Sequence, residues 1–342
     1  MRFFSPLSGL ICATLISGCA STSAAPPGAA LSAEDPRFHD VVAPDARIER
    51  LAEGFTWAEG PAWVDDGAYL LFTDVPENRI HRWSDADGLS LFLEPSGYDG
   101  PPTEVLREAG ANGLFVEPSG SVLMADSGSR ALARLDPRTK RKTVLARAFD
   151  GRRFNSPNDV VARSDGAIFF TDPPYGLEGL DESPVKELPF NGVYRLDPDG
   201  SVHLLDDGLT RPNGIALSPD GRTLYVANSD PARAIWMAYA LDADGAVTSR
   251  RVFADATDLV GDDAPGLPDG MAVAADGTVF ATGPGGVLVF AADGTRLGRI
   301  ATGGPVANVT FGGADRRTLY LASDSILARV PLKIAGAAAV AR

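Results

Sequence analysis

The sequence has few residues of the kinds that build disulfide frameworks, soft-metal sites or basic surfaces. It contains two cysteines and three histidines in 342 residues, which argues against a disulfide-stabilised fold and against zinc as the preferred metal. Its formal net charge is -14, so the average surface repels phosphate backbones and anionic membranes. The one basic run, residues 138–142 (RTKRK), is typical of a solvated hairpin turn. We therefore expect no nucleic-acid partner.

The N-terminus has the pattern of a bacterial lipoprotein signal peptide over residues 1–18. Arg2 precedes an apolar stretch that ends at Ile16, and Cys19 is followed by Ala20. Cleavage before Cys19 would leave a lipidated thiol at the new N-terminus. The pattern predicts a protein of the bacterial cell envelope that faces the periplasm and meets the membrane only through this anchor. The alternatives are a plain secretory signal and an uncleaved apolar N-terminus.

Beyond this segment, no run approaches the 18 or more apolar residues of a membrane span. Residues 19–45 begin with small residues and proline, and they are predicted to form a flexible tether. Residues 46–342 are predicted to form a single domain, and we expect this domain to be monomeric.

Six copies of a short repeat occupy the predicted domain. Each copy consists of an apolar run, a turn usually built on Asp-Gly or Ser-Gly, and a second run with Phe, Tyr or Leu. The copies are PAWVDDGAYLLFTD from Pro61, GLFVEPSGSVLMADSG from Gly113, DVVARSDGAIFFTD from Asp159, GIALSPDGRTLYVANSD from Gly214, GMAVAADGTVFATG from Gly270 and VTFGGADRRTLYLASD from Val309. Another hairpin pattern lies between successive copies, so each repeat holds four strands.

Six four-stranded antiparallel units with no helical periodicity between them predict an all-β fold, a six-bladed β-propeller. After the sixth copy only SILARV remains, which leaves that blade one strand short, while ARIERLAEG from Ala46 is unassigned. This N-terminal strand is predicted to complete the last blade and close the ring. An open β-sandwich is the alternative, but it does not explain one equivalent polar position in every repeat.

That polar position stands directly before the first strand of each repeat, and it is always a carboxylate or an amide. The six residues are Glu59, Asn112, Asn158, Asn213, Asp269 and Asn308. Because the first strand of each propeller blade lines the central channel, we expect these side chains to converge at one mouth of the axis. The alternative is that Asn-Gly and Asp-Gly are only turn residues. Six equivalent positions at once make that alternative weak.

A ring of carboxylate and amide oxygens without thiolate or imidazole is the ligand set of a hard cation. It indicates one divalent ion, with Ca²⁺ first, Mg²⁺ or Mn²⁺ behind it, and Zn²⁺ less favoured.

The motifs AEGPAW, FNSPNDVV, TDPPYG, RPNGIALSPDGRTLYV and PDGMAV occur in this order and are specific in combination. With them the chain resembles the gluconolactonase, regucalcin (senescence marker protein) and luciferin-regenerating enzyme family. The resemblance extends from about residue 46 to about residue 331. It implies a six-bladed propeller with a divalent cation at its axis, and hydrolysis of sugar lactones as the activity.

Carried over by motif, the metal ligands would be Glu59, Asn158, Asn213 and Asp269. The resemblance implies Asp269 as the base that guides an attacking water, with Glu59 as the alternative. Direct attack by Asp269 through a covalent intermediate stays open.

Residues for substrate contact are expected near the same mouth. The resemblance suggests Arg153, and Asn155 is a second candidate from the same loop. Asn112 is a further candidate for substrate contact, and Tyr175 could form a wall of the site or only pack. The long Gly- and Pro-rich loop from Pro95 to Gly110 is expected to cover the mouth.

Two other functions fit the same pattern of residues. The metal site could act on another ester or on an organophosphate instead of a lactone. A non-enzymatic propeller could also use calcium to rigidify its axis and bind a partner on its face.

Overall fold

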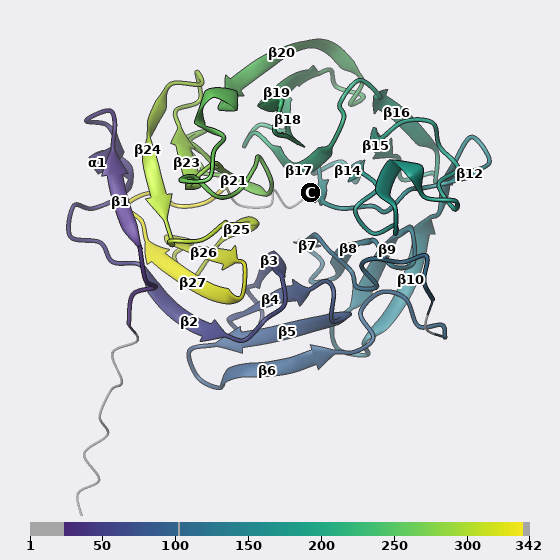
Figure 1. Ribbon diagram of the computed structural model, residues 1–342, viewed down its shortest axis with the longest axis horizontal. Coiled ribbons are helices and arrows are strands. Elements are labelled where there is room, and N and C mark those ends of the chain that lie inside the picture. Colours follow the sequence, from purple (N-terminus) through teal and green to yellow (C-terminus); the bar gives the residue numbers. More distant parts are fainter. Residues whose placement is uncertain (1–23, 102, 338–342) are drawn as a thin grey trace, which may run out of the picture.

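Six antiparallel sheets surround a common axis, as Figure 1 shows in the view along that axis. The computed structural model describes residues 24–101 and 103–337. Each sheet contains a four-stranded antiparallel unit, which confirms the predicted six-bladed β-propeller. The predicted signal peptide and Cys19 lie outside the described residues.

Strands follow one another outward from the axis in each of the first five blades. Blade 1 contains β3 (Ala58–Val64), β4 (Tyr69–Asp74), β5 (Arg79–Ser84) and β6 (Gly88–Leu93). Blade 2 contains β7 (Leu114–Val116), β8 (Val122–Asp126), β9 (Ala131–Asp136) and β10 (Arg141–Ala146). Blade 3 contains β13 (Val160–Ala162), β14 (Ile168–Asp172), β15 (Gly192–Leu196) and β16 (Val202–Asp206). The basic run 138–142 covers the end of the β9–β10 turn and the first two residues of β10, which places it at the predicted hairpin.

Blades 4 and 5 repeat this arrangement. Blade 4 contains β17 (Pro212–Leu217), β18 (Thr223–Asp230), β19 (Arg233–Leu241) and β20 (Val247–Asp255). Blade 5 contains β21 (Met271–Val273), β22 (Val279–Gly283), β23 (Gly286–Phe290) and β24 (Arg296–Ala301). A separate small hairpin joins β11 (Ala148–Phe149) and β12 (Arg152–Arg153).

Blade 6 is closed by a strand from the front of the chain. It contains β25 (Asn308–Gly312), β26 (Thr318–Ser323), β27 (Ile326–Pro331) and, on its outer edge, β2 (Glu49–Glu53). Glu49 lies opposite Arg329 in this register, and the Arg329 Nε donates to Glu49 Oε2 at 2.6 Å. The predicted ring closure by the N-terminal strand is therefore confirmed.

The recurring Asp-Gly pairs form the turns between the two inner strands of a blade. In blade 4, Arg222 N donates to Asp220 Oδ1 at 3.1 Å, and Gly221 takes a left-handed conformation with φ 66°. A carboxylate that accepts the N–H two residues ahead recurs in blades 3, 5 and 6, at Asp165, Asp276 and Asp315. Because these turns share the same local chemistry, the number of blades can be predicted from the sequence.

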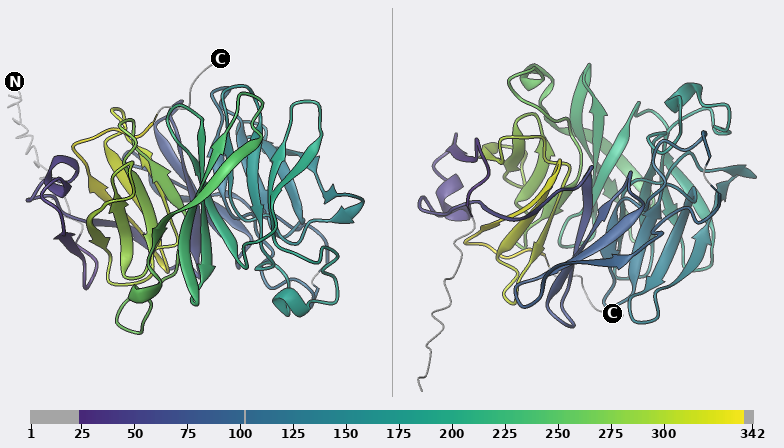
Figure 2. Two further views of the ribbon diagram at one scale, coloured as in Figure 1. Left: turned by 90° about the horizontal axis from the view of Figure 1, so that it is seen from above. Right: turned by 60° about the horizontal axis from the view of Figure 1, so that its bottom comes forward.

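Helices in the described ranges are short, and none is long and apolar enough to cross a membrane. They are α1 (Phe38–Val41) and two 3₁₀ turns, η1 (Leu180–Glu182) and η2 (Thr257–Leu259). Figure 2 shows the disc from the side, with loops extending from both of its faces.

The segment before β2 packs on the propeller, contrary to the prediction of a flexible tether up to residue 45. A fifth strand, β1 (Ala30–Ala33), pairs antiparallel with β24 on the outer edge of blade 5. Beyond it, α1 buries Phe38 and Val41. The small-residue composition at the start of this segment predicted flexibility, but the aromatic and β-branched residues that follow it have apolar surface to bury.

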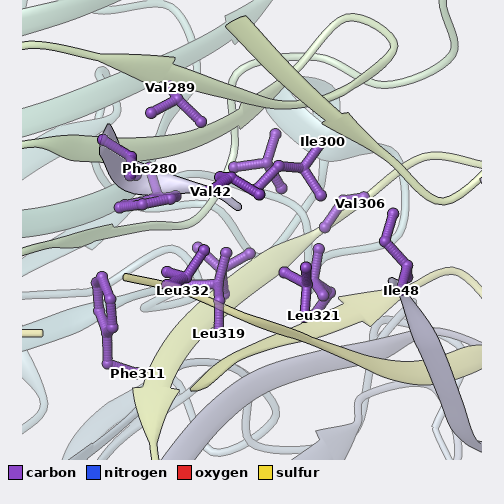
Figure 3. Close-up of a cluster of buried hydrophobic side chains, with 14 of the residues drawn as sticks. Val42, Ile48, Phe280, Val289, Ile300, Val306, Phe311, Leu319, Leu321 and Leu332 are labelled. Carbon is purple, nitrogen blue, oxygen red and sulfur yellow. The ribbon is translucent and has the colours of Figure 1, made fainter. Parts of the chain in front are cut away.

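That surface belongs to a cluster of buried apolar side chains between blades 5 and 6 (Figure 3). Val42 and Ile48 from the N-terminal segment join Phe280 of β22 and Leu321 of β26 in this cluster. Gly298 of β24 gives Phe38 its place, because a Cβ at residue 298 would lie 2.6 Å from Phe38 Cδ2. The docked segment is therefore part of the folded unit.

A Phe38→Ala substitution tests this docking. We expect it to lower the free energy of unfolding by about 3–5 kcal/mol, because it removes a fully buried ring and leaves a cavity. Urea denaturation gives the measurement, and Leu89→Ala is the matched control. Leu89 is 42% exposed on β6, so its truncation should cost less than about 0.5 kcal/mol. Equal stability of the two variants would show that residues 30–42 do not contribute to the folded unit.

Candidate active site

One mouth of the propeller axis opens into a cavity of about 740 Å³, which we call the axial cavity. Five of the six polar positions that precede the first strands of the repeats line it: Glu59, Asn112, Asn158, Asn213 and Asp269. They come from five different blades. Because the inner strand of every blade starts at the same face, residues far apart in the chain meet there.

The sixth position lies behind this cavity. Asn308, the first residue of β25, lines a hollow of about 800 Å³ at the opposite mouth, together with Asp159. Its Oδ1 accepts a hydrogen bond from Val309 N at 2.8 Å, and its side chain also hydrogen-bonds the carboxyl groups of Glu59 and Asp159. Asn308 thus holds the back of Glu59 and does not face the cavity.

The glycine behind several ring residues allows neighbouring inner strands to approach closely. Gly214 lies within β17 and has no positive φ, so the Asn213-Gly214 pair is not a turn. A Cβ on Gly214 would lie 2.1 Å from the carbonyl oxygen of Asp269 in the next blade. A Cβ on Gly113 would likewise lie 2.3 Å from Asp159 Oδ1. At these positions the interpretation of the pairs as turn residues is wrong. The glycines are required because neighbouring inner strands lie in close contact there.

Asn213 presents an unsatisfied oxygen. Its Nδ2 donates to Ser229 Oγ at 2.8 Å, which leaves the amide oxygen Oδ1 as the free end of the group. That oxygen is buried, and no described residue donates a hydrogen bond to it. Ser229 Oγ in turn donates to the carbonyl oxygen of Pro268, beside Asp269, and also hydrogen-bonds Tyr175. A buried acceptor without a donor is costly, so this oxygen is available to a hydrogen-bond donor or to a cation in the cavity.

Carboxyl groups around the axis lack compensating positive charge. Burial raises the pKa of Glu59, and the charge of Asp159 raises it further against the hydrogen bond from Gly60 N. Burial also raises the pKa of Asp269, with contributions from the charges of Glu59 and Asp159. Arg107 is the only Lys or Arg that lines the axial cavity in the part of the chain that the structure describes. Like charges this close and this buried are stabilised by a cation between them.

The residues present fit a hard divalent cation. All candidate ligand atoms are oxygens, two from carboxylates and two from amides, and one amide oxygen has no donor. Over residues 24–101 and 103–337 there is no cluster of three or more His, Cys, Asp and Glu that could hold a metal. A site here would therefore depend on Asn158 and Asn213, in keeping with calcium chemistry and not with zinc chemistry.

The comparisons with known proteins agree with this geometry. The SMP-30/gluconolactonase/LRE-like family model matches residues 57–325. The chain belongs to this family. It is 45% identical to a gluconolactonase of Zymomonas mobilis over 306 residues, which is 88% of this chain and 85% of that protein. It is 32% identical to a pentonolactonase of Haloferax volcanii over 269 residues, 77% of this chain and 80% of that protein.

Solved structures give the same result. A Xanthomonas campestris gluconolactonase superimposes with a TM-score of 0.77 at 32% identity, covering 91% of this chain and 97% of that one. A calcium-binding protein of Agrobacterium tumefaciens, a regucalcin, shares the fold with a TM-score of 0.65 at 20% identity, covering 84% of this chain and 94% of that one. The predicted membership of the gluconolactonase and regucalcin family is confirmed.

Two residues that the family resemblance suggested for substrate contact lie away from the axial cavity. Arg153 is exposed on β12, where its N donates to Glu187 Oε2 at 2.8 Å and its Nη2 donates to Ser129 O at 3.1 Å. Asn155 is fully buried, and its Nδ2 donates to Asp172 O at 2.9 Å. Their loop turns into blade 3 because Asp172 accepts the N–H groups that start this turn. This geometry gives neither residue a contact with a ligand in the cavity.

Tyr175 and Asn112, the other two suggested residues, do line the cavity. The loop from Pro95 to Gly110 contributes Arg107 and Glu108 to its wall, in agreement with its expected position at the mouth. Glu108 and Ser229 also line the cavity, and the sequence analysis did not single them out. The loop was a signal for Glu108, whereas nothing in the repeat distinguishes Ser229.

Substitution of Gly214 by Ala tests the close contact between the inner strands of blades 4 and 5. The added methyl group would overlap the Asp269 carbonyl oxygen, so we expect a loss of about 1–3 kcal/mol in the free energy of unfolding, measured in urea. Gly304→Ala is the control, because a Cβ there meets nothing within 4 Å and the residue has no positive φ. A Gly214→Ala protein as stable as this control would contradict the close approach.

Proposed function

We propose that this member of the family is a calcium-dependent lactonase that opens sugar lactones in the axial cavity. The enzyme class rests on the relatives: a gluconolactonase and a pentonolactonase match most of this chain. The metal dependence rests on one observation of this structure, the buried Asn213 Oδ1 that has no donor and lies in the cavity with Glu59 and Asp269. The cavity volume of about 740 Å³ is within the range of small-molecule sites.

Glu59, Asn158, Asn213 and Asp269 would hold the cation, with calcium preferred for this all-oxygen set. When bound, a divalent cation polarises a carbonyl group and stabilises negative charge on its oxygen. The Ser229 hydroxyl fixes the Asn213 amide so that Oδ1, and not Nδ2, is the end available to the cation. Asn308 supports Glu59 from behind in the same way.

Asp269 is the residue that would accept the proton of the attacking water, since it is a carboxylate at the cavity wall and itself one of the four candidate ligands. Its neighbour Pro268 is tied by its carbonyl oxygen to Ser229, which holds the start of β21 in place. Tyr175 and Asn112 would position the lactone from the side walls.

An Asp269→Asn protein separates cation binding from catalysis, because the amide keeps an oxygen ligand and loses the base. We expect kcat for glucono-δ-lactone to fall by at least about 100-fold, while added calcium still raises the thermal unfolding midpoint of chelator-treated protein. Asp263→Asn, an exposed residue outside the cavity, is the control. Hydrolysis that survives in Asp269→Asn with calcium bound would rule out this base. Hydrolysis by the unsubstituted protein that survives chelation would rule out the metal dependence.

We also propose that the mature protein is attached to a bacterial envelope membrane through a lipid on Cys19 and faces the periplasm. The support is the sequence pattern around Cys19. β1 begins at Ala30, so the first strand of the folded unit would start eleven residues after the anchor.

A Cys19→Ser substitution tests the anchor. Expressed in a bacterial host with lipoprotein processing, we expect the native chain to fractionate with membranes and to carry the mass of an acylated Cys19. The Cys19→Ser protein should lack this mass and appear in the soluble fraction. Cys12→Ser is the control, because Cys12 lies in the segment that is removed. A native mature chain with an unmodified mass would contradict the proposal.

A further inference from the structure

Glu108 is a partly buried carboxyl group on the wall of the axial cavity, and no described residue donates a hydrogen bond to its side chain. Its side chain is 15% exposed, and it lines the cavity from the loop between blades 1 and 2. The closest cation is Arg107, whose half-exposed Nη2 lies 3.7 Å from Glu108 Oε1. Burial raises the pKa of Glu108 to about 7, and Arg107 lowers it only in part. Such a group is stabilised by any ligand that brings donors to it.

The backbone holds Glu108 in a fixed place. Arg107 N and Glu108 N both donate to Gly176 O, at 3.0 and 3.4 Å, and Glu178 N donates to Val105 O at 3.0 Å. Residues 105–108 therefore run antiparallel to residues 176–178, which directly follow Tyr175. These main-chain hydrogen bonds between two loops fix the backbone that carries the Glu108 side chain.

Glu108 faces the candidate ligands without being one of them. It lines the same cavity as Glu59 and Asp269, and its charge raises the pKa of both. It does not occupy the position before an inner strand that the ring residues share. The ring residues and Glu108 therefore border one cavity.

We propose that Glu108 determines substrate specificity, by accepting hydrogen bonds from hydroxyl groups on the ring of the lactone. This inference rests on the proposed lactonase function. A carboxyl group has two acceptor oxygens, which suit two adjacent hydroxyl groups of a sugar lactone. An unsubstituted lactone brings no donor to this partly buried carboxyl, and a site built for a hydroxyl discriminates strongly against a substrate that lacks it. The cavity thus selects polyhydroxylated lactones over plain ones.

The test compares glucono-δ-lactone with δ-valerolactone, which has the same ring without hydroxyl groups. We expect Glu108→Ala to lower kcat/KM for glucono-δ-lactone by about 10- to 100-fold. For δ-valerolactone, kcat/KM should stay within about twofold or rise, because no hydroxyl contact is lost. Glu108→Gln, which keeps one acceptor and nearly the same shape, should lie between Glu108→Ala and the native protein. Glu104→Gln, an exposed carboxyl of the same loop, is the matched control and should change neither value.

Each outcome decides between the two proposals. An equal fall for both lactones in Glu108→Gln and Glu108→Ala, or no change for either lactone, would overturn the specificity role. If the unsubstituted, calcium-loaded protein hydrolysed neither glucono-δ-lactone nor δ-valerolactone, the proposed function itself would be overturned. Thermal midpoints of the variants with and without calcium separate a loss of substrate contact from a loss of fold.

Discussion

The close approach of six inner strands around one axis is the constraint on which the rest of the molecule depends. At Gly214 the neighbouring strand comes so near that even a methyl group would overlap the Asp269 carbonyl oxygen. Contacts this short leave no room for side chains between the strands, so the residues just before them project into the mouth of the channel. Because each of these positions holds a carboxylate or an amide, the residues that precede the packed strands form a ring of oxygens. The scaffold and the candidate site thus have one origin.

That ring creates an electrostatic imbalance which the protein alone does not relieve. Glu59 is buried, Asp269 is partly buried on the same cavity wall, and Asp159 lies behind them. Among the described residues, Arg107 is the one cationic side chain on this wall, and it is half-exposed to solvent. Charged groups in such surroundings are costly unless a counter-charge is present. The unsatisfied Asn213 oxygen marks the same place. The same cavity is lined by the polar ring of a chain whose relatives include a gluconolactonase and a pentonolactonase.

The N-terminal segment shows how a composition-based expectation can fail. Small residues and proline near residue 25 predicted a tether, yet Phe38, Val41 and Val42 are buried against blades 5 and 6. Whether an apolar residue in an irregular segment is buried depends on the surface available elsewhere in the fold. Gly298, about 260 residues further along the chain, leaves room for the Phe38 ring. The sequence around Phe38 therefore does not predict this burial.

The sequence by itself determined the blade count, the ring closure by β2 and the polar position before each inner strand. These features repeat, and each depends on local chemistry such as the Asp220-Gly221 turn, so six copies reinforce one weak signal. The tertiary structure alone decided which polar residues face the cavity. It turned Asn155 into blade 3, placed Asn308 behind Glu59, and brought Ser229 and Glu108 to the wall. Those placements arise from single contacts between loops distant in the chain. Because each contact occurs only once, it produces no repeat in the sequence from which it could be predicted.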